Sequence, residues 1–219
     1  MCLWAHKPAQ DNPLPLYDTI MNIMTECNLA SLISEILNGK VLVFPTETSY
    51  GIGCDATNQT SVDKVFAIKG RSDNKPLLIV VDSIETAKKY LRWNETLENL
   101  ALKYWPGPLT IVGEYVGGNL AKGVVGADNT VAVRVSDFPF LKSITQKIQR
   151  PLVATSANLA GEPSLYDAQE IIKVFFDKEN QPDIILNYGV LPTIAATTLV
   201  SVVGNEFKIL RQGSLEIKL

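Results

Sequence analysis

Short apolar runs alternate along this chain with segments whose apolar residues recur at helical spacing. Before residue 40, Leu29, Leu32 and Ile36 would share one face of a helix, and Gly39 follows where a C-terminal cap is expected. The run VLVF at 41–44 comes next and predicts a buried strand that ends at Pro45. This alternation limits the chain to folds in which helices and strands take turns.

The same two patterns continue to the C-terminus. Helices are expected at about 60–68, 83–91, 95–104, 138–149 and 167–177, and strands at 77–81, 109–115, 131–135 and 151–155, with closing strands in DIILN, ATTLVSV and EFKILR. Interleaved strands and helices indicate an α/β domain, and the final group of strands indicates some antiparallel pairing. We therefore expect a single α/β domain with a twisted mixed sheet and flanking helices.

The N-terminal segment differs from the rest of the chain. Residues 1–27 contain Pro8, Pro13 and Pro15, which favour an extended or loosely packed segment. No cationic start precedes an apolar core there, as a signal peptide would require, and no apolar run approaches the ~18 residues of a membrane span. We expect a loosely packed extension at 1–27, a folded domain at 28–219, a cytoplasmic location and no membrane partner.

Residue counts exclude several classes of site. The three cysteines are scattered, so they fit neither a disulfide framework nor a zinc knuckle. The only histidine, His6, lies in the proline-rich segment, which argues against Ser-His-Asp or Cys-His catalysis and against common catalytic zinc sites. The net charge of −3 argues against nucleic-acid binding through a global positive field, although local basic patches remain open.

Two nucleotide-binding motifs can be set aside. The segment GIGCDA at 51–56 satisfies the loose dinucleotide pattern, but PTETSY separates it from the preceding strand and the helix signal comes only at Thr60. No G-x-x-x-x-G-K-[ST] sequence occurs, so the chain has no P-loop. If it uses a nucleotide, it binds the nucleotide in another way.

Polar clusters lie next to several predicted strands. PTETSYG at 45–51 and TSAN at 155–158 follow strands, while TTLV at 197–200 and LRQG at 210–213 lie in the last two. Ligands often bind at strand ends in open α/β sheets. Each cluster also has a purely structural interpretation: PTET as a capped turn, TSAN as a helix N-cap, and Arg134 and Arg211 as residues on exposed strand faces.

Three cations precede the apolar run 77–81. Lys69, Arg71 and Lys75 all stand in KGRSDNKPLLIVV, close to a segment that predicts a buried strand. A buried site for polyphosphate needs several fixed cations, because unpaired burial of such charge is costly. Lysine supplies a point charge and arginine a planar set of donors for phosphate oxygens.

The ordered set of motifs resembles the YrdC-like family of threonylcarbamoyl-AMP synthases. The segments FPTETSYGIGCDA, KGRSDNKPLLIVV, WPGPLTIV, VAVRV, PLVATSANLAGEPS and ILRQG carry this resemblance over residues 29–213. Val80 and the nearby end of the chain match the short, single-domain form. The resemblance implies a basic central cavity and a nucleotidyltransferase that forms L-threonylcarbamoyladenylate and pyrophosphate from L-threonine, bicarbonate or CO₂, and ATP, for tRNA t6A37 modification.

The resemblance also implies roles for individual residues. It makes Lys69 and Arg71 catalytic, and it assigns ATP binding to Lys69, Arg71, Lys75, Ser156, Asn158 and Arg211. It assigns threonine and bicarbonate binding to Thr46, Thr48, Tyr50, Arg134 and Thr197, where Thr197 replaces the serine usual in the family. Mg²⁺ is expected to bind through the ATP phosphates, without ligands from the protein.

Partners and alternatives follow from the same resemblance. It implies a hand-off of the product to the tRNA threonylcarbamoyl-transferase machinery and leaves a weak contact with tRNA open. Two other functions remain: an RNA-binding module, and a relative of the same fold that acts on another carbamoyl-type or nucleotide substrate.

Overall fold

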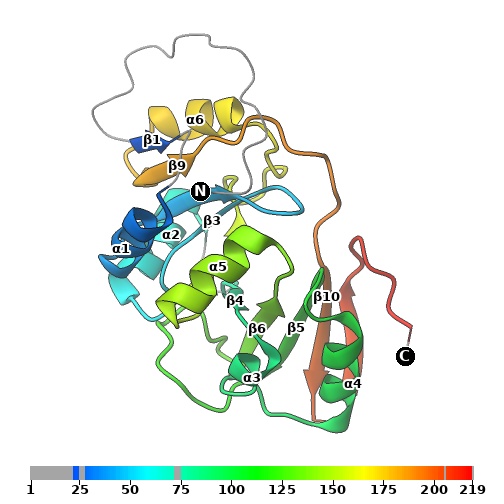
Figure 1. Cartoon of the computed structure of the whole chain (residues 1–219). Helices are drawn as coiled ribbons and strands as arrows, with labels where there is room; N and C mark the ends of the chain where they lie inside the picture. The colour runs from blue at the N-terminus through cyan, green and yellow to red at the C-terminus, as the bar shows by residue number, and fades with distance from the viewer. Residues whose placement is uncertain (1–21, 25–27, 72–74, 205, 219) are drawn as a thin grey trace.

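The computed structural model describes residues 22–24, 28–71, 75–204 and 206–218. Strands and helices alternate through most of the described chain, which confirms the α/β class (Figure 1). The strands form two mixed sheets, one in the upper and one in the lower part of Figure 1. The predicted extension at 1–27 lies outside the described residues except for Asn22–Met24, which form a strand.

The first sheet has five strands in the order β1-β9-β2-β3-β8. β1 and β2 both run parallel to β9, whereas β3 runs antiparallel to β2 and to β8. The bounds are Asn22–Met24 for β1, Leu42–Pro45 for β2, Tyr50–Gly53 for β3, Thr155–Ser156 for β8 and Ile184–Leu186 for β9. β2 and β3 form a hairpin, so the segment after Pro45 turns back into the sheet.

The second sheet has six strands in the order β11-β10-β5-β6-β4-β7. The pairs β10–β5 and β4–β6 are parallel, and the other pairs are antiparallel. The bounds are Ile79–Val81 for β4, Leu109–Glu114 for β5, Thr130–Val135 for β6, Leu152–Val153 for β7, Thr198–Val203 for β10 and Glu206–Arg211 for β11. The amino ends of β5 and β10 therefore lie at the same edge as the carboxyl ends of β4 and β6.

The two sheets meet where the chain passes from β7 to β8. Only Ala154 separates these two strands. On the facing segment, Cys54 accepts a hydrogen bond from Val153 N at 2.8 Å, and Ala56 N donates to Pro151 at 3.0 Å. Backbone pairing thus continues from one sheet to the other, and Cys54 lies fully buried at this junction.

Six helices occur in the described residues. They are α1 (Leu29–Leu37), α2 (Gln59–Lys69), α3 (Ile84–Ala87), α4 (Glu95–Tyr104), α5 (Pro139–Ile148) and α6 (Ala168–Phe176). Side chains of Asn28, Asn58 and Asn94 cap the first turns of α1, α2 and α4. None of the described helices is long and apolar enough to cross a membrane.

Two buried apolar clusters hold the layers together. The larger fills the space around β3, β5 and β6 and includes Tyr50, Ile52 and Val133. The smaller lies beneath α1 and α5, where Leu32 and Ile36 pack with Ile144. Figure 1 shows α5 in front of β4, which agrees with this packing.

The structure differs from the sequence-based prediction at two elements. The helix expected at 83–91 ends at Ala87, and Leu91 instead bridges to Tyr115 beside β5. The strand β3 was not predicted, because Gly51 and Gly53 break the apolar alternation that marks a strand. The structure explains Gly53: a Cβ there would lie 1.7 Å from Val153 O.

We predict that Gly53→Ala destabilises the fold by about 3 kcal/mol or more, because the clash is with backbone at the sheet junction. Gly70→Ala is the matched control. Gly70 has φ of +58° but no atom within 4 Å of an added Cβ, so only conformational strain of about 1–2 kcal/mol is expected. Urea unfolding measures both changes, and equal losses would contradict a special role for the junction.

Candidate active site

The turn between β2 and β3, residues 46–49, is organised by Thr46. Its Oγ1 donates to Ser49 O at 2.7 Å and accepts from the backbone N–H groups of Thr48 and Ser49. It also lies 3.1 Å from Thr48 Oγ1. The interpretation of PTET as a capped turn is therefore confirmed, and the turn holds its side chains in a fixed arrangement.

Tyr50 begins β3 and is fully buried. Its hydroxyl donates to Gly189 O at 2.9 Å and accepts from Tyr188 N at 3.0 Å. Burial raises the pKa of this phenol well above its usual value. The structure thus shows a link between β3 and the segment after β9, and the threonine-binding role of Tyr50 stays a prediction.

Arg134 lies near the carboxyl end of β6 and is only 5% exposed. Its Nη2 forms an ion pair with Glu47 of the turn, and its Nε donates to Gly107 O at 3.0 Å. Burial lowers the pKa of Arg134 to about 10, while Asp137 acts in the opposite direction. The guanidinium therefore stays charged at neutral pH, and the interpretation of Arg134 as an exposed strand residue is wrong.

Two threonines and Arg211 form a group at the same sheet edge. Thr110 and Thr197 are buried, and their Oγ1 atoms lie 2.9 Å apart. Arg211, which is exposed, donates through Nη2 to Thr197 O at 2.9 Å. Ile111 pairs with Val133, so one further step in this antiparallel register sets Thr110 opposite Arg134. The second sheet therefore brings Arg134, Thr197 and Arg211 to one edge.

A second group forms around Lys69 at the end of α2. Lys69 is 3% exposed, and its Nζ donates to Ser156 O at 2.5 Å, Asn158 O at 2.8 Å and Asn158 Oδ1 at 3.1 Å. Ser156 Oγ donates to the same Asn158 Oδ1 at 2.5 Å. No helix begins at this segment, so the helix N-cap interpretation of TSAN is wrong.

The charge of Lys69 is held in an unusual environment. Burial, with a contribution from the nearby Arg71, lowers the pKa of Lys69 to about 8. The amine is still protonated at neutral pH, and its three oxygen partners favour that charged form. A buried cation therefore stands beside the Ser156–Asn158 segment, as a site for a polyanion requires.

Arg71 and Lys75 flank residues that the structure does not describe. Arg71 Nε donates to Lys75 O at 2.8 Å, and its Nη2 donates to Pro76 O at 2.9 Å. Burial lowers the pKa of this guanidinium. The Lys75 side chain is exposed. In this structure Arg71 bonds to the backbone of Lys75 and Pro76, and the ATP-binding roles of Arg71 and Lys75 stay predictions.

The hairpin connects the two groups. Glu47 contacts Arg134, and four residues later Gly51 pairs with Ser156, whose carbonyl binds Lys69. The sequence analysis missed Glu47 and Thr110, although both lie in segments that it singled out. Glu47 was overlooked because a carboxylate is unexpected among anion-binding residues, and Thr110 because its neighbour Thr197 is distant in sequence.

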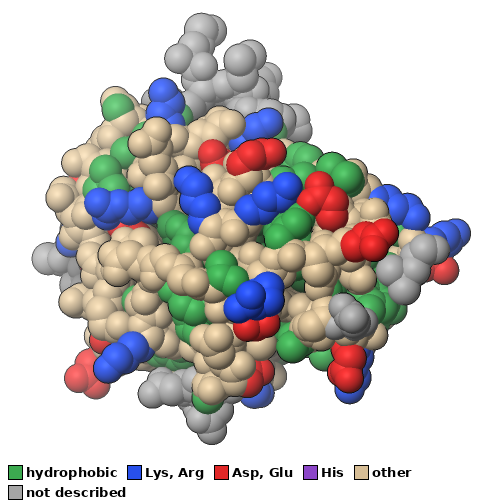
Figure 2. Space-filling view, turned by 90° about the horizontal axis from the view of Figure 1, so that it is seen from below, with side chains coloured by type: hydrophobic (Ala, Val, Ile, Leu, Met, Phe, Trp, Pro, Cys, Tyr) green, Lys and Arg blue, Asp and Glu red, His purple; other side chains and the backbone are tan. Residues whose placement is uncertain are grey.

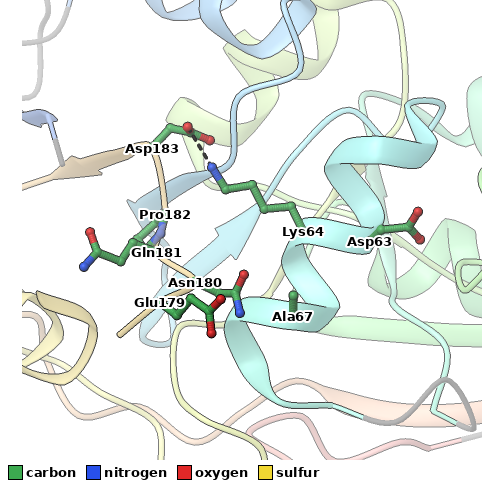
Figure 3. Close-up of a pocket in the computed structure, with 8 residues that line it drawn as sticks. All are labelled: Asp63, Lys64, Ala67, Glu179, Asn180, Gln181, Pro182 and Asp183. Atoms are coloured by element: carbon green, nitrogen blue, oxygen red, sulfur yellow. Dashed lines mark ion pairs between the residues drawn. The ribbon is translucent and has the colours of Figure 1, made fainter. Parts of the chain in front are cut away.

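Two surface hollows lie elsewhere. One of about 470 Å³ lies between α2 and the 179–183 loop, where Lys64 extends to Asp183 at 2.8 Å (Figure 3). The other is lined by Thr57, Asn58, Gln59, Asn119 and Arg150. Neither includes a predicted site residue, so the basic central cavity stays a prediction. In the described part of the chain, no group of three or more His, Cys, Asp or Glu could hold a metal ion.

Several solved structures match the fold of this chain over most of its length. A doubly substituted P. abyssi Sua5 matches with a TM-score of 0.79 and 29% identity over 90% of this chain and 60% of its own. P. abyssi Sua5 complexed with L-threonine matches with a TM-score of 0.77 and 30% identity, over 89% and 58%. E. coli YciO has the same fold, with a TM-score of 0.75 and 19% identity over 91% of this chain and 97% of its own.

The chain thus spans 60% or less of the length of these two Sua5 chains. A family model for Sua5, YciO and YrdC, described as "Telomere recombination", matches residues 34–213. This match covers every predicted site residue, from Thr46 to Arg211. The chain therefore belongs to the Sua5/YciO/YrdC family.

Proposed function

We propose that this chain is an L-threonylcarbamoyladenylate synthase, a nucleotidyltransferase that acts in tRNA t6A37 modification. The observation that carries the proposal is the likeness to P. abyssi Sua5 in complex with L-threonine, at 30% identity. The buried cations Lys69 and Arg134, one beside β8 and the other at the β2–β3 turn, add chemical support. The substrates would be L-threonine, bicarbonate or CO₂, and ATP.

The proposed reaction has two steps. The amine of threonine attacks bicarbonate and forms a carbamate, with loss of water. A carbamate oxygen then attacks the α-phosphorus of ATP, the bond to the bridging oxygen breaks, and pyrophosphate leaves. Phosphoryl-type transfer depends mainly on positioning and on electrostatic stabilisation, so a site built from fixed cations and hydroxyls suits it.

Lys69 would act chiefly through its charge. All three of its N–H groups already bond to protein oxygens, so direct contact with a phosphate oxygen requires the exchange of one bond. Two of those oxygens have a second donor: Ser156 O accepts from Asn158 N, and Asn158 Oδ1 accepts from Ser156 Oγ. If Lys69 exchanges its bond to either of these oxygens for one to a phosphate oxygen, that oxygen still has a hydrogen-bond donor. Arg71 would stabilise the transition state with Lys69, and Lys75, Ser156, Asn158 and Arg211 would hold the nucleotide.

The other group of residues would hold the amino acid. Arg134 offers a permanent charge for the carboxylate or carbamate, and Thr46, Thr48 and Thr197 offer hydroxyls. Mg²⁺ would bind through the ATP phosphates and neutralise part of their charge. Glu47 is already paired with Arg134 and so is not available as a ligand for Mg²⁺. This agrees with binding of the ion through the phosphates of the substrate.

The product is proposed to pass to the tRNA threonylcarbamoyl-transferase machinery. RNA binding as the main role finds no support on the face in Figure 2, where Lys and Arg are interspersed with Asp and Glu. Nonspecific RNA binding depends on a concentrated positive field and is steeply salt-dependent. A weak contact with tRNA and a cytoplasmic location remain part of the proposal.

We predict that pyrophosphate release requires L-threonine, bicarbonate and Mg²⁺·ATP together, and that mass spectrometry will detect the threonylcarbamoyl adenylate. Serine should support slower release, because the missing methyl group is worth about 1–3 kcal/mol in a fitted pocket. Release that does not depend on any amino acid would contradict the proposed function. Preference for a different amine would instead favour a relative with another carbamoyl-type substrate.

We predict that Lys69→Met lowers turnover by about 100-fold or more while Tm changes by less than about 5 °C. Burial lowers the pKa of Lys69 from 10.5 to about 8. The buried charge therefore costs about 3 kcal/mol of stability at neutral pH, and its removal offsets the lost hydrogen bonds. Exposed Lys142 on α5 provides the control, Lys142→Met. Cooperative unfolding of Lys69→Met at a much lower temperature would make Lys69 structural.

We predict that kcat/KM for ATP falls as pH rises through about 8, where Lys69 of the ligand-free protein loses its proton. Arg71 lowers that pKa, so Arg71→Gln should move the alkaline limb to higher pH even though it reduces the rate. Lys142→Gln should leave the limb in place. All variants are compared at saturating threonine and bicarbonate, so that ionisation of the substrate is common to them. If the alkaline limb stays at the same pH in Arg71→Gln, the limb does not arise from deprotonation of Lys69.

A further inference from the structure

The guanidinium of Arg134 is only partly used by the protein. Nε donates to Gly107 O at 3.0 Å, and Nη2 pairs with Glu47. Among the described residues, Nη1 makes no hydrogen bond, although the side chain is only 5% exposed. An arginine this deeply buried normally has its donors satisfied, so Nη1 is a donor held ready for a ligand.

Nη1 is also accessible from outside the protein. In the described part of the chain, the one fully buried side-chain oxygen or nitrogen without a partner is Gln181 Oε1. Nη1 has no partner among the described residues and is not such a fully buried atom, so part of its surface is exposed. An accessible arginine donor in a buried side chain suits a carboxylate or a carbamate, whose oxygens accept charge-assisted hydrogen bonds.

We propose that Glu47 is a positioning residue that fixes Arg134 for the carboxylate or carbamate group of the amino-acid substrate. This inference rests on the proposed function. A single bond to Gly107 would let the guanidinium plane rotate about Nε. The second bond, to Glu47, fixes the plane and with it the direction of both Nη1 donors. Glu47 thereby sets the geometry of an anion contact that it does not make itself.

The position of Glu47 is itself fixed. Thr46 Oγ1 bonds to Ser49 O and to the N–H groups of Thr48 and Ser49, so the turn that carries Glu47 is held on both sides. Ser136 Oγ lies 3.5 Å from Glu47 Oε2 and also accepts from Phe138 N at 3.1 Å, ahead of α5. These contacts place the carboxylate between the hairpin of one sheet and the end of β6 in the other.

The same contact could instead make Glu47 a competitor that occupies the anion site of Arg134. The geometry favours positioning, because Glu47 takes only Nη2 and leaves Nη1 available. The two roles predict opposite signs. Removal of a competitor strengthens binding of the substrate carboxylate, whereas removal of a positioning group weakens it.

The test compares wild type, Glu47→Gln and Glu47→Ala in L-threonine binding by calorimetry and in steady-state kinetics. We expect Glu47→Gln, which keeps an acceptor oxygen, to weaken threonine binding about 10-fold, and Glu47→Ala to weaken it more. The KM for ATP should change little. Both variants should lower Tm, because Arg134 loses its counter-charge, so binding is measured at a temperature where every variant is folded. The matched control is Glu114→Gln, which removes the half-exposed pair of Glu114 with Arg92 (2.8 Å) and should alter neither constant.

A double-mutant comparison identifies the route of the effect. In an Arg134→Gln background, Glu47→Gln should have no further effect on threonine affinity, because its role acts through Arg134. Additive losses would overturn the inference, as would unchanged or tighter threonine binding in both single variants, or unfolding of both. If wild type binds threonine but forms no adenylate, the proposed function fails while calorimetry still decides the role of Glu47.

Discussion

Burial of positive charge is the constraint on which this structure depends. Lys69 and Arg134 both lie beneath the surface, where an unpaired cation would be costly. The chain resolves the two cases differently. Lys69 is surrounded by carbonyl and amide oxygens from Ser156 and Asn158, whereas Arg134 has a full counter-charge in Glu47. Because the partners come from the β2–β3 turn, from β8 and from the segment just after β8, the cations can be held only when these parts of the chain are in place. The Arg134–Glu47 pair thus joins the two sheets, and Lys69 joins the end of α2 to the first sheet.

The two cations also differ in what they can contribute. The amine of Lys69 titrates near physiological pH, since burial lowers its pKa to about 8. The guanidinium of Arg134 keeps its charge across the whole useful range, with a pKa of about 10 even after burial. Charge is redistributed over the phosphate oxygens in the transition state, and a nearby cation stabilises it. A carboxylate is bound best by a permanently charged and correctly oriented group such as a guanidinium. Under the proposed function, Lys69 would serve the nucleotide chemistry and Arg134 the recognition of the amino acid.

Sequence reasoning recovered the fold class, and the family resemblance pointed to the residues around Lys69 and Arg134. Helical period and apolar runs were sufficient for α1, α4, α5 and α6, because these elements bury one regular face. They failed for β3, whose Gly51 and Gly53 carry no apolar side chain, and for α3, where Leu91 leaves the helix to join Tyr115. Glu47 and Thr110 were missed for a different reason. Their roles depend on partners 87 residues away in the chain, and only tertiary structure brings such residues together. Local propensity carries no information on such contacts.

The junction between the sheets has a chemical consequence for Cys54. This residue lies fully buried where its carbonyl accepts the hydrogen bond from Val153, and burial raises the pKa of its thiol far above the usual value. Oxidants and alkylating agents react with the thiolate, so the folded protein presents almost none of the reactive form at this position. Oxidation or alkylation of Cys54 therefore requires the junction between the two sheets to open. The rate at which the Cys54 thiol reacts therefore reports how often the junction opens, because the thiol stays unreactive while the backbone hydrogen bond between Cys54 and Val153 is intact.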